Sequence, residues 1–377
     1  MIESVSLSDF RNYSSFSADF SPGLNIIRGQ NAQGKTNLLE ALHLLASARS
    51  FRSARDRDML RFGAEGGFVR GVVVLPDGRR SELEARLFAR KRRESFRNGA
   101  KLRRASDFTG TLSAVLFTPE DLELVRGGAE TRRRMLDLCI SQLRPRYAGA
   151  LSDFNRLYAH KNRILRDFRE NPSLLPPLRD FNAGLSETGA ALIYYRAAFI
   201  LKLRERARAV HLECSGSAEE LSLTYKTVRG VDAENPDRRT ILDAILTRQE
   251  ELYDAELSSG QCLVGAQRDD VEITINGVAA RNFASQGQAR TAALSMKFAE
   301  RDLMSEDTGR APLLLLDDVL SELDAARRAY VLERIGGGQA FITCCEPIEA
   351  ESLSGARLLE IDGGSLVSCI STFPAEP

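Results

Sequence analysis

The residues best suited to chemistry form a glycine-rich segment near the N-terminus. Residues 29–36 match the phosphate-binding pattern G-x-x-x-x-G-K-[ST] in full. Consecutive backbone N–H groups of such a loop surround phosphate oxygens, and the following helix adds the positive end of its dipole. Lys35 is expected to reach the β- and γ-phosphates, and the Thr36 hydroxyl to bind Mg²⁺. The predicted nucleotide-binding residues are Gly29, Gln30, Asn31, Ala32, Gln33, Gly34, Lys35, Thr36 and Asn37.

Two carboxylates at the end of an apolar run supply the second half of this chemistry. Leu313–Leu316 predicts a buried strand, and Asp317 and Asp318 follow it directly. Asp317 is expected to hold Mg²⁺ through its water shell, and Asp318 to orient or deprotonate the attacking water. A helix cap after a core strand is the alternative, and the phosphate loop in the same chain favours catalysis. Lys35, Asp317 and Asp318 are therefore the predicted catalytic residues.

The elements around these residues predict an α/β fold with two parts. Residues 24–27 read as a short buried strand before the loop, and residues 37–46 as an apolar helix after it. Alternating residues over 68–88, with Pro76-Asp77-Gly78 between them, predict an antiparallel hairpin. Helical spacing from 132 to 211, interrupted at 171–177, predicts two antiparallel helices. We expect a split head, residues 1–120 and 215–377, with a helical arm inserted at 121–214.

A short stretch of the predicted β region is strongly basic. Nine arginines and lysines lie between residues 86 and 104 against a single acid, Glu94, although the whole chain has a net charge of zero. Such a strip can contact a phosphate backbone and release counterions. A solvated sheet edge protected by charge is the alternative. Arg90, Arg92 and Arg93 are the candidate DNA contacts.

Composition excludes several other classes of protein. The six cysteines include no C-x-x-C pair, which gives no reason to expect a disulfide framework or a zinc site. The N-terminus lacks the pattern of a secretion signal. The apolar stretch 189–203 contains Arg196 and Lys202 and is too short to span a bilayer. We expect a cytoplasmic protein without a membrane partner.

The order of these motifs resembles that of ABC-type and SMC-like ATPase heads. The phosphate loop is followed by Ser285-x-Gly287-Gln288, the aspartate pair and Ser321-Glu322-Leu323-Asp324. In detail the chain resembles the RecF family over nearly its whole length. The stretches that carry this resemblance are residues 10–13, 34–41, 50–52, 119–122, 268–270 and 316–319. It implies an ATPase head of mixed sheet with an antiparallel β subdomain and an inserted helical arm.

The resemblance also implies a mechanism in which ATP joins two copies of the chain. Ser285, Gly287 and Gln288 would form the signature segment that acts on the opposite subunit, with Ser285 and Gly287 contacting the γ-phosphate held there. Ser321 and Asp324 would form the D-loop. The ATP-dependent homodimer would bind double-stranded DNA near single-strand gaps, and slow hydrolysis would release it. RecR and RecO would be partners in loading a RecA-type recombinase during DNA repair, replication-fork maintenance and the SOS response. From its residues alone, the 285–288 segment is equally an ordinary helix cap.

Some positions depart from the family pattern, and other functions stay open. Ala32 stands where glycine is usual, Gln267 where histidine is usual, and Ala289 where glutamine is usual. Thr343 takes the place of the switch histidine of transporter ATPases. The alternatives are another SMC-like DNA-clamping ATPase, a transporter ATPase and a metabolic P-loop kinase. Turnover stimulated by duplex DNA would distinguish the proposed ATPase from a kinase or a transporter subunit.

Overall fold

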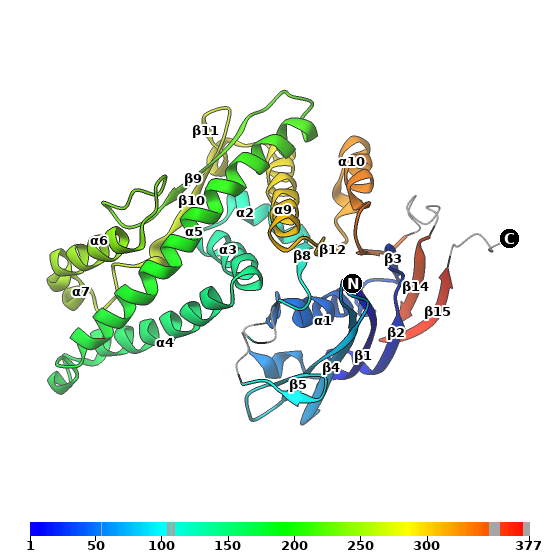
Figure 1. Ribbon diagram of the computed structural model, residues 1–377, viewed down its shortest axis with the longest axis horizontal. Helices are drawn as coiled ribbons and strands as arrows, with labels where there is room; N and C mark the ends of the chain where they lie inside the picture. The colour runs from blue at the N-terminus through cyan, green and yellow to red at the C-terminus, as the bar shows by residue number, and fades with distance from the viewer. Residues whose placement is uncertain (54, 104–106, 108–109, 347–354, 372–377) are drawn as a thin grey trace. The chain divides into compact units, whose positions relative to one another are not determined.

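The computed structural model describes residues 1–53, 55–103, 107, 110–346 and 355–371 (Figure 1). The chain divides into two compact units. The first consists of Met1–Asp121 and Glu300–Pro377, and the second of Leu122–Ala299. Among the described helices, none combines the length and the apolar character needed to cross a bilayer.

The first unit is built on a mixed sheet whose parallel strands end beside the phosphate loop. Its strand order is β15-β14-β3-β13-β12-β8, and β15 is the antiparallel member. The residues of β12 and β13 are all buried, as expected for strands covered on both faces. The bounds are β3 Leu24–Arg28, β8 Ala114–Phe117, β12 Leu313–Asp317, β13 Ala340–Cys344, β14 Arg357–Asp362 and β15 Ser365–Ser371.

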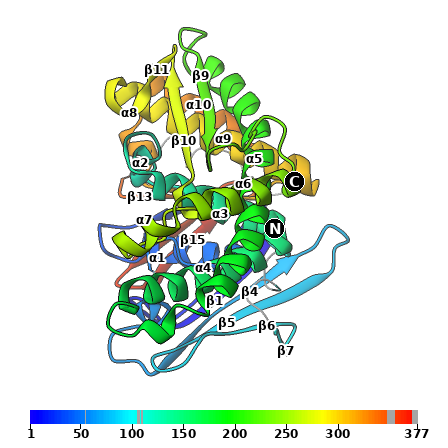
Figure 2. The same ribbon diagram turned by 90° about the vertical axis from the view of Figure 1, so that its left-hand side faces the viewer.

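An antiparallel sheet forms the other layer of this unit. Its order is β2-β1-β4-β5-β6-β7, and it contains the predicted hairpin as β4 and β5, which Figure 2 shows as a long ribbon. Helix α1, Lys35–Ser47, contributes apolar side chains to a core that both sheets share. The bounds are β1 Ile2–Phe10, β2 Tyr13–Asp19, β4 Gly66–Val74, β5 Arg80–Phe88, β6 Glu94–Arg97 and β7 Ala100–Lys101.

The second unit is mainly helical. The predicted pair of antiparallel helices is present as α4, Pro145–Asp167, and α5, Leu178–Cys214. Their close approach explains two glycines, because a Cβ at Gly184 would lie 3.0 Å from Leu157 and one at Gly189 would lie 3.3 Å from Phe154. The other α-helices that lie wholly within this unit are α2 Leu122–Arg126, α3 Ala129–Leu143, α6 Arg238–Glu251, α7 Tyr253–Ser259 and α8 Ala280–Phe283.

This unit extends beyond the predicted arm boundary at residue 214. A small antiparallel sheet of β9 Leu221–Lys226, β10 Asp270–Ile275 and β11 Val278–Ala279 belongs to it (Figure 2). Strand β9 and helix α6 both pack on α5, which explains why the unit continues to Ala299. Helix α9, Gln286–Thr308, contains the boundary between the two units.

Candidate nucleotide-binding site

The predicted phosphate loop joins the end of β3 to the start of α1. Gly34 has a φ of 120°, and a Cβ there would lie 2.9 Å from the side chains of Asn12 and Tyr13, so only glycine fits. Ala32 has a φ of 65°, in the left-handed region. A Cβ in this region costs about 1–2 kcal/mol, which is the physical cost of having alanine where the family usually has glycine.

The turn between β1 and β2 braces the loop from outside. Tyr13 donates its hydroxyl hydrogen to the carbonyl of Gly34 at 2.9 Å, and the amide of Asn12 donates to the carbonyl of Gln33 at 2.8 Å. Asn37 in turn donates to the Asn12 side chain at 2.8 Å. Asn37 and Asn12 therefore position the loop backbone, a role that motif reading does not reveal.

Arg11 holds the first turns of α1 from the same side. Its guanidinium donates to both carboxylate oxygens of Glu40, at 2.8 and 2.7 Å, and the Glu40 side chain is fully buried. Bidentate pairs of this kind fix geometry as well as contributing energy. The sequence stretch Phe10–Tyr13 thus acts as a clamp on the loop and its helix.

The side chain of Lys35 lies against the backbone of the phosphate loop. Its Nζ donates to the carbonyls of Gly29 at 2.6 Å and Gln30 at 2.9 Å, and it lies 3.3 Å from Cys345 Sγ. The side chain is buried. The ammonium is therefore held over the loop backbone, where it would meet phosphate oxygens bound by the N–H groups.

The two predicted Mg²⁺ ligands lie side by side. Thr36 donates its hydroxyl hydrogen to Asp317 Oδ1 at 2.9 Å, and Thr343 donates to the same oxygen at 2.9 Å. Burial raises the pKa of Asp317, and the hydrogen bonds from the two threonines partly oppose that shift. Hydroxyl and carboxylate oxygens are the donors that Mg²⁺ prefers, and they leave further positions for water and nucleotide phosphates.

Replacing Asp317 by asparagine is expected to stabilise the nucleotide-free protein at neutral pH and to weaken Mg²⁺-dependent nucleotide binding. The raised pKa means that the folded chain holds the Asp317 proton more tightly than the unfolded chain does. This contribution to stability is complete below the unfolded pKa and is lost as pH rises through the folded pKa. Thermal unfolding at pH 7 should show a gain of roughly 1–3 °C, which shrinks towards acid pH. An unchanged Mg²⁺ titration of nucleotide binding would contradict the assignment of Asp317.

Asp318 leaves the strand in an unusual backbone conformation. Its φ is 54°, which is uncommon outside glycine and is found preferentially at functional sites. Its N–H donates to Thr343 Oγ1 at 2.9 Å, and Ser321 donates to its carbonyl at 2.7 Å. Thr343 therefore links the two aspartates, since its hydroxyl contacts both residues.

Asp324, the second predicted D-loop residue, lies at the start of helix α10, Ala325–Ile335. Its side chain caps this helix by accepting a hydrogen bond from the N–H of Arg327 at 2.9 Å.

The predicted signature residues Ser285, Gly287 and Gln288 belong to the second unit. At the start of α9, the N–H of Ser285 donates to Gln288 Oε1 at 2.8 Å, and the N–H of Gln288 donates to Ser285 Oγ at 3.2 Å. This reciprocal capping box satisfies two N–H groups at the beginning of the helix. Gly287 lies between them. The helix cap considered as an alternative is present, and it fixes Ser285 at the helix N-terminus.

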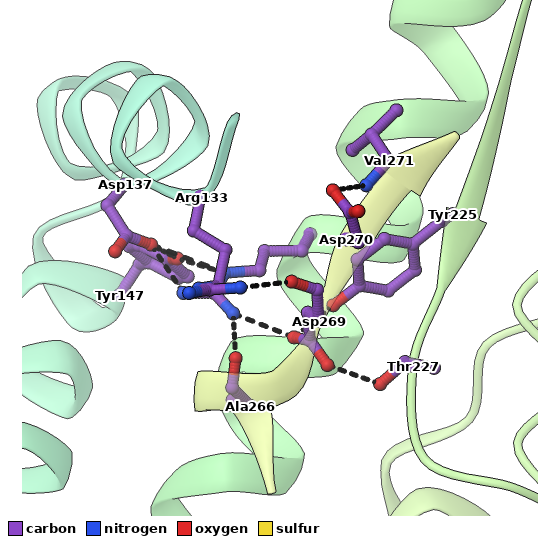
Figure 3. A network of polar contacts seen from close by, with 10 residues as sticks. Arg133, Asp137, Tyr147, Tyr225, Thr227, Ala266, Asp269, Asp270 and Val271 are labelled. Carbon is purple, nitrogen blue, oxygen red and sulfur yellow. Dashed lines mark hydrogen bonds and ion pairs between the residues drawn. The ribbon is translucent and has the colours of Figure 1, made fainter. Parts of the chain in front are cut away.

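Within the stretch 268–270, Asp269 lies at the centre of a buried polar network in the second unit (Figure 3). Asp269 accepts from Arg196 at 2.7 Å, from the Tyr225 hydroxyl at 2.5 Å and from Thr227 at 2.6 Å. Arg196 also donates to Asp137 at 2.8 Å. The network joins α3, α5 and the segments that flank the small sheet. These hydrogen bonds tie the segments together, and the sequence motifs assigned no role to these residues.

One of the three candidate DNA contacts points inward. Arg93 donates to the carbonyl of Ala48 at 2.6 Å and lies 3.7 Å from Asp56, and only 13% of its side chain is exposed. Arg90 and Arg92 are exposed, and Arg90 lies 3.7 Å from Glu65. Acids from neighbouring segments therefore reduce the charge asymmetry read from the sequence. The inclusion of Arg93 is corrected, because its guanidinium ties the hairpin to the chain after α1.

The chain matches known proteins over almost the whole length of both sequences. A family model described as the RecF/RecN/SMC N terminal domain matches residues 1–353. The DNA replication and repair protein RecF of Symbiobacterium thermophilum is 41% identical over 370 residues, which are 97% of this chain and 98% of that protein. The chain belongs to the RecF family. The protein of the same name from Listeria welshimeri is 37% identical over 97% of this chain and 99% of its own length.

Solved structures agree with this assignment. The recombination mediator protein RecF-ATPrS in the RecFOR pathway is similar to this chain with a TM-score of 0.89 and 34% identity, covering 97% of both chains. The Smc head domain of Pyrococcus furiosus is similar with a TM-score of 0.55 and 16% identity, over 98% of this chain and 96% of its own. The second likeness concerns the fold alone. The predicted family and the predicted ATPase-head fold are confirmed.

Proposed function

We propose that this chain is an ATP-gated DNA-binding protein of DNA replication and repair. The observation that carries the proposal is the hydrogen bond between Thr36 and Asp317, which joins the phosphate loop to the aspartate pair. Membership of the RecF family supports the choice of DNA over a small acceptor substrate, since the curated relatives are named DNA replication and repair proteins. A related RecF structure is described as RecF-ATP, which supports ATP as the nucleotide.

The residues predicted to surround the nucleotide have distinct physical parts in this proposal. The loop N–H groups and Lys35 bind and orient the phosphates, and Thr36 with Asp317 would hold Mg²⁺. When bound, Mg²⁺ would neutralise charge that develops on the transferred phosphoryl group. Asp318, turned out of the strand by its positive φ, would orient the attacking water. Ser285 and Gly287 of a second copy, in the signature segment that Gln288 completes, would contact the γ-phosphate at a helix N-terminus.

ATP then acts as the ligand that shifts the protein from monomer to dimer. A ligand favours the state that it binds more tightly, and a γ-phosphate that contacts two copies favours the dimer. Slow hydrolysis removes that contact and releases the partner. The dimer would bind double-stranded DNA near single-strand gaps. RecO and RecR would act with it in loading a RecA-type recombinase, which agrees with the RecFOR pathway named for the related structure.

Light scattering is the experiment that tests this proposal. The chain has a mass of 41.7 kDa, and we expect that mass with ADP and twice that mass with ATP. Added duplex DNA should shift the dimer into a heavier complex only when ATP is present. A monomer under all three conditions would leave the nucleotide loop intact but would remove the dimer from the mechanism.

A further inference from the structure

The first unit carries two neighbouring segments rich in exposed cations, and one of them contains a fully exposed aromatic ring. We call these segments, residues 47–66 and 89–94, the arginine rim. These segments contain nine arginines and lysines against four acids. Arg93 is the inward-pointing tether described above. The exposed cations of the rim are Arg49, Arg52, Arg55, Arg57, Arg61, Arg90, Lys91 and Arg92.

Backbone and side-chain contacts join the two segments into one surface. The N–H of Ala89 donates to the carbonyl of Glu65 at 3.1 Å. Arg93 reaches across to the Ala48 carbonyl at 2.6 Å and to Asp56 at 3.7 Å. The turn after β5 therefore lies against the turn that precedes β4, although more than twenty residues separate them in the sequence.

Phe62 stands at the tip of the turn between these contacts. Its side chain is fully exposed, whereas most large apolar side chains of the chain are buried. The turn itself is fixed, because the N–H of Arg61 donates to the Asp9 carbonyl at 2.8 Å and the N–H of Ala64 donates to the Arg61 carbonyl at 3.0 Å. Gly63 follows with a φ of 83°. A fixed turn thus presents a bare ring to solvent directly after Arg61.

The chemistry of this surface identifies its partner. The exposed arginines and lysines favour an anionic ligand. The exposed aromatic ring favours a ligand with a flat apolar face on which it can stack. A nucleic acid with an unstacked base offers both, because the phosphates meet the arginines and the base meets the ring. The interior of a duplex offers no free base face, whereas a strand end or a gap does.

We propose that Phe62 stacks on an unpaired nucleobase at the junction of double-stranded and single-stranded DNA while the arginine rim holds the flanking phosphates. The inference rests on the proposed function and deepens it, since it assigns the preference for gapped DNA to one side chain. Stacking of one base on an aromatic ring corresponds to roughly a 5- to 150-fold difference in affinity. Phosphate contacts would contribute to all DNA forms equally and would be weakened by salt.

The test compares binding of plain duplex and gapped duplex by fluorescence anisotropy with saturating ATP. The full-length wild type is measured beside Phe62→Ala, Phe62→Trp and a double variant, Arg90→Glu with Arg92→Glu. Tyr253→Ala is the matched control, because it removes an exposed aromatic ring that is followed by an exposed acid, Asp254, in α7. A 2-aminopurine base at the gap edge reports stacking directly through its fluorescence.

We expect Phe62→Ala to lose 5-fold or more in affinity for gapped DNA and to keep the wild-type affinity for plain duplex. Phe62→Trp should keep the preference for gapped DNA over plain duplex, and it should keep the quenching of 2-aminopurine fluorescence that Phe62→Ala loses. The double arginine variant should weaken binding to both DNAs and lower the dependence on salt.

Each contrary result has a distinct meaning. A wild type that binds neither DNA overturns the proposed function and the stacking with it. Equal loss on both DNAs in Phe62→Ala overturns stacking alone. An altered ATP-dependent mass of Phe62→Ala also overturns it, because the ring would then contact a second copy of the chain.

Discussion

Replacing Arg196 by methionine is expected to lower the free energy of unfolding by about 3–5 kcal/mol, because it leaves buried carboxylates without a counter-charge. Arg196 donates to Asp269 and to the carbonyl of Ala266, both at 2.7 Å, and the side chains of Arg196 and Asp269 are 3% and 1% exposed. Arg196 also donates to Asp137. Urea denaturation followed by circular dichroism measures the change.

The same variant should show a specific dependence on pH. Burial raises the pKa of Asp269, and Arg196 is the main group that opposes this shift. Removing Arg196 therefore raises that pKa further, so that the carboxyl contributes most to stability at acid pH and the contribution is lost as pH rises through the folded value. The destabilisation should be greater at pH 8 than at pH 5.

An exposed arginine on the same helix provides the control. Arg204 pairs with Glu234 at 2.9 Å, and these side chains are 29% and 56% exposed. Exposed pairs contribute at most about 1 kcal/mol, so Arg204→Met should change stability little. Equal losses for the two variants would show that the network of Figure 3 contributes no more than a surface pair.

Replacing Lys35 by alanine is expected to weaken ATP binding by about 100-fold and to abolish the ATP-dependent dimer at moderate ATP concentration. One hydrogen bond to a charged group contributes about 1.5–3 kcal/mol, and a loss of about 2.8 kcal/mol corresponds to 100-fold in affinity. The loss of the phosphate contact expected of the Lys35 ammonium accounts for an effect of this size. Titration with a fluorescent ATP analogue and light scattering measure the two effects. Lys226→Ala, which removes an exposed lysine from β9, is the control.

Mixing two inactive proteins tests whether the site is shared between copies. A heterodimer of Lys35→Ala with Ser285→Arg contains one composite site in which the lysine and the serine are both intact. We expect the mixture to recover part of the ATPase activity that each variant lacks alone. A mixture as inactive as its components would indicate that Ser285 does not complete the site of a second copy.

The parts of the site that could be predicted from the sequence consist of residues that are adjacent in the chain. The strand, loop and helix around Lys35 follow from spacing alone, and so does the strand that ends at Asp317. The β4–β5 hairpin was equally readable, because its turn residues and alternation are local. The meeting of Thr36 with Asp317 could be anticipated, since parallel strands bring their carboxyl ends to one edge.

The parts that were missed depend on contacts between distant segments. Charge counting along residues 86–104 could not reveal that Arg93 turns towards Ala48 and Asp56. Thr343 contacts both aspartates only because β13 pairs with β12. The role of Asp269 in a structural network needed Arg196, which is more than seventy residues earlier in the chain. The β14–β15 hairpin carries no motif and was not predicted.

That last hairpin determines when the nucleotide loop can be completed. The N–H of Gly363 donates to Gln33 Oε1 at 2.6 Å, across 330 positions of sequence, and the N–H of Gly364 donates to the Gln33 carbonyl at 3.0 Å. Strand β3 itself pairs with β13 and β14. Synthesis proceeds from the N-terminus, and pairings between distant segments form slowly. The nascent chain therefore carries its phosphate loop from the start but gains a fixed loop only when its final strands arrive.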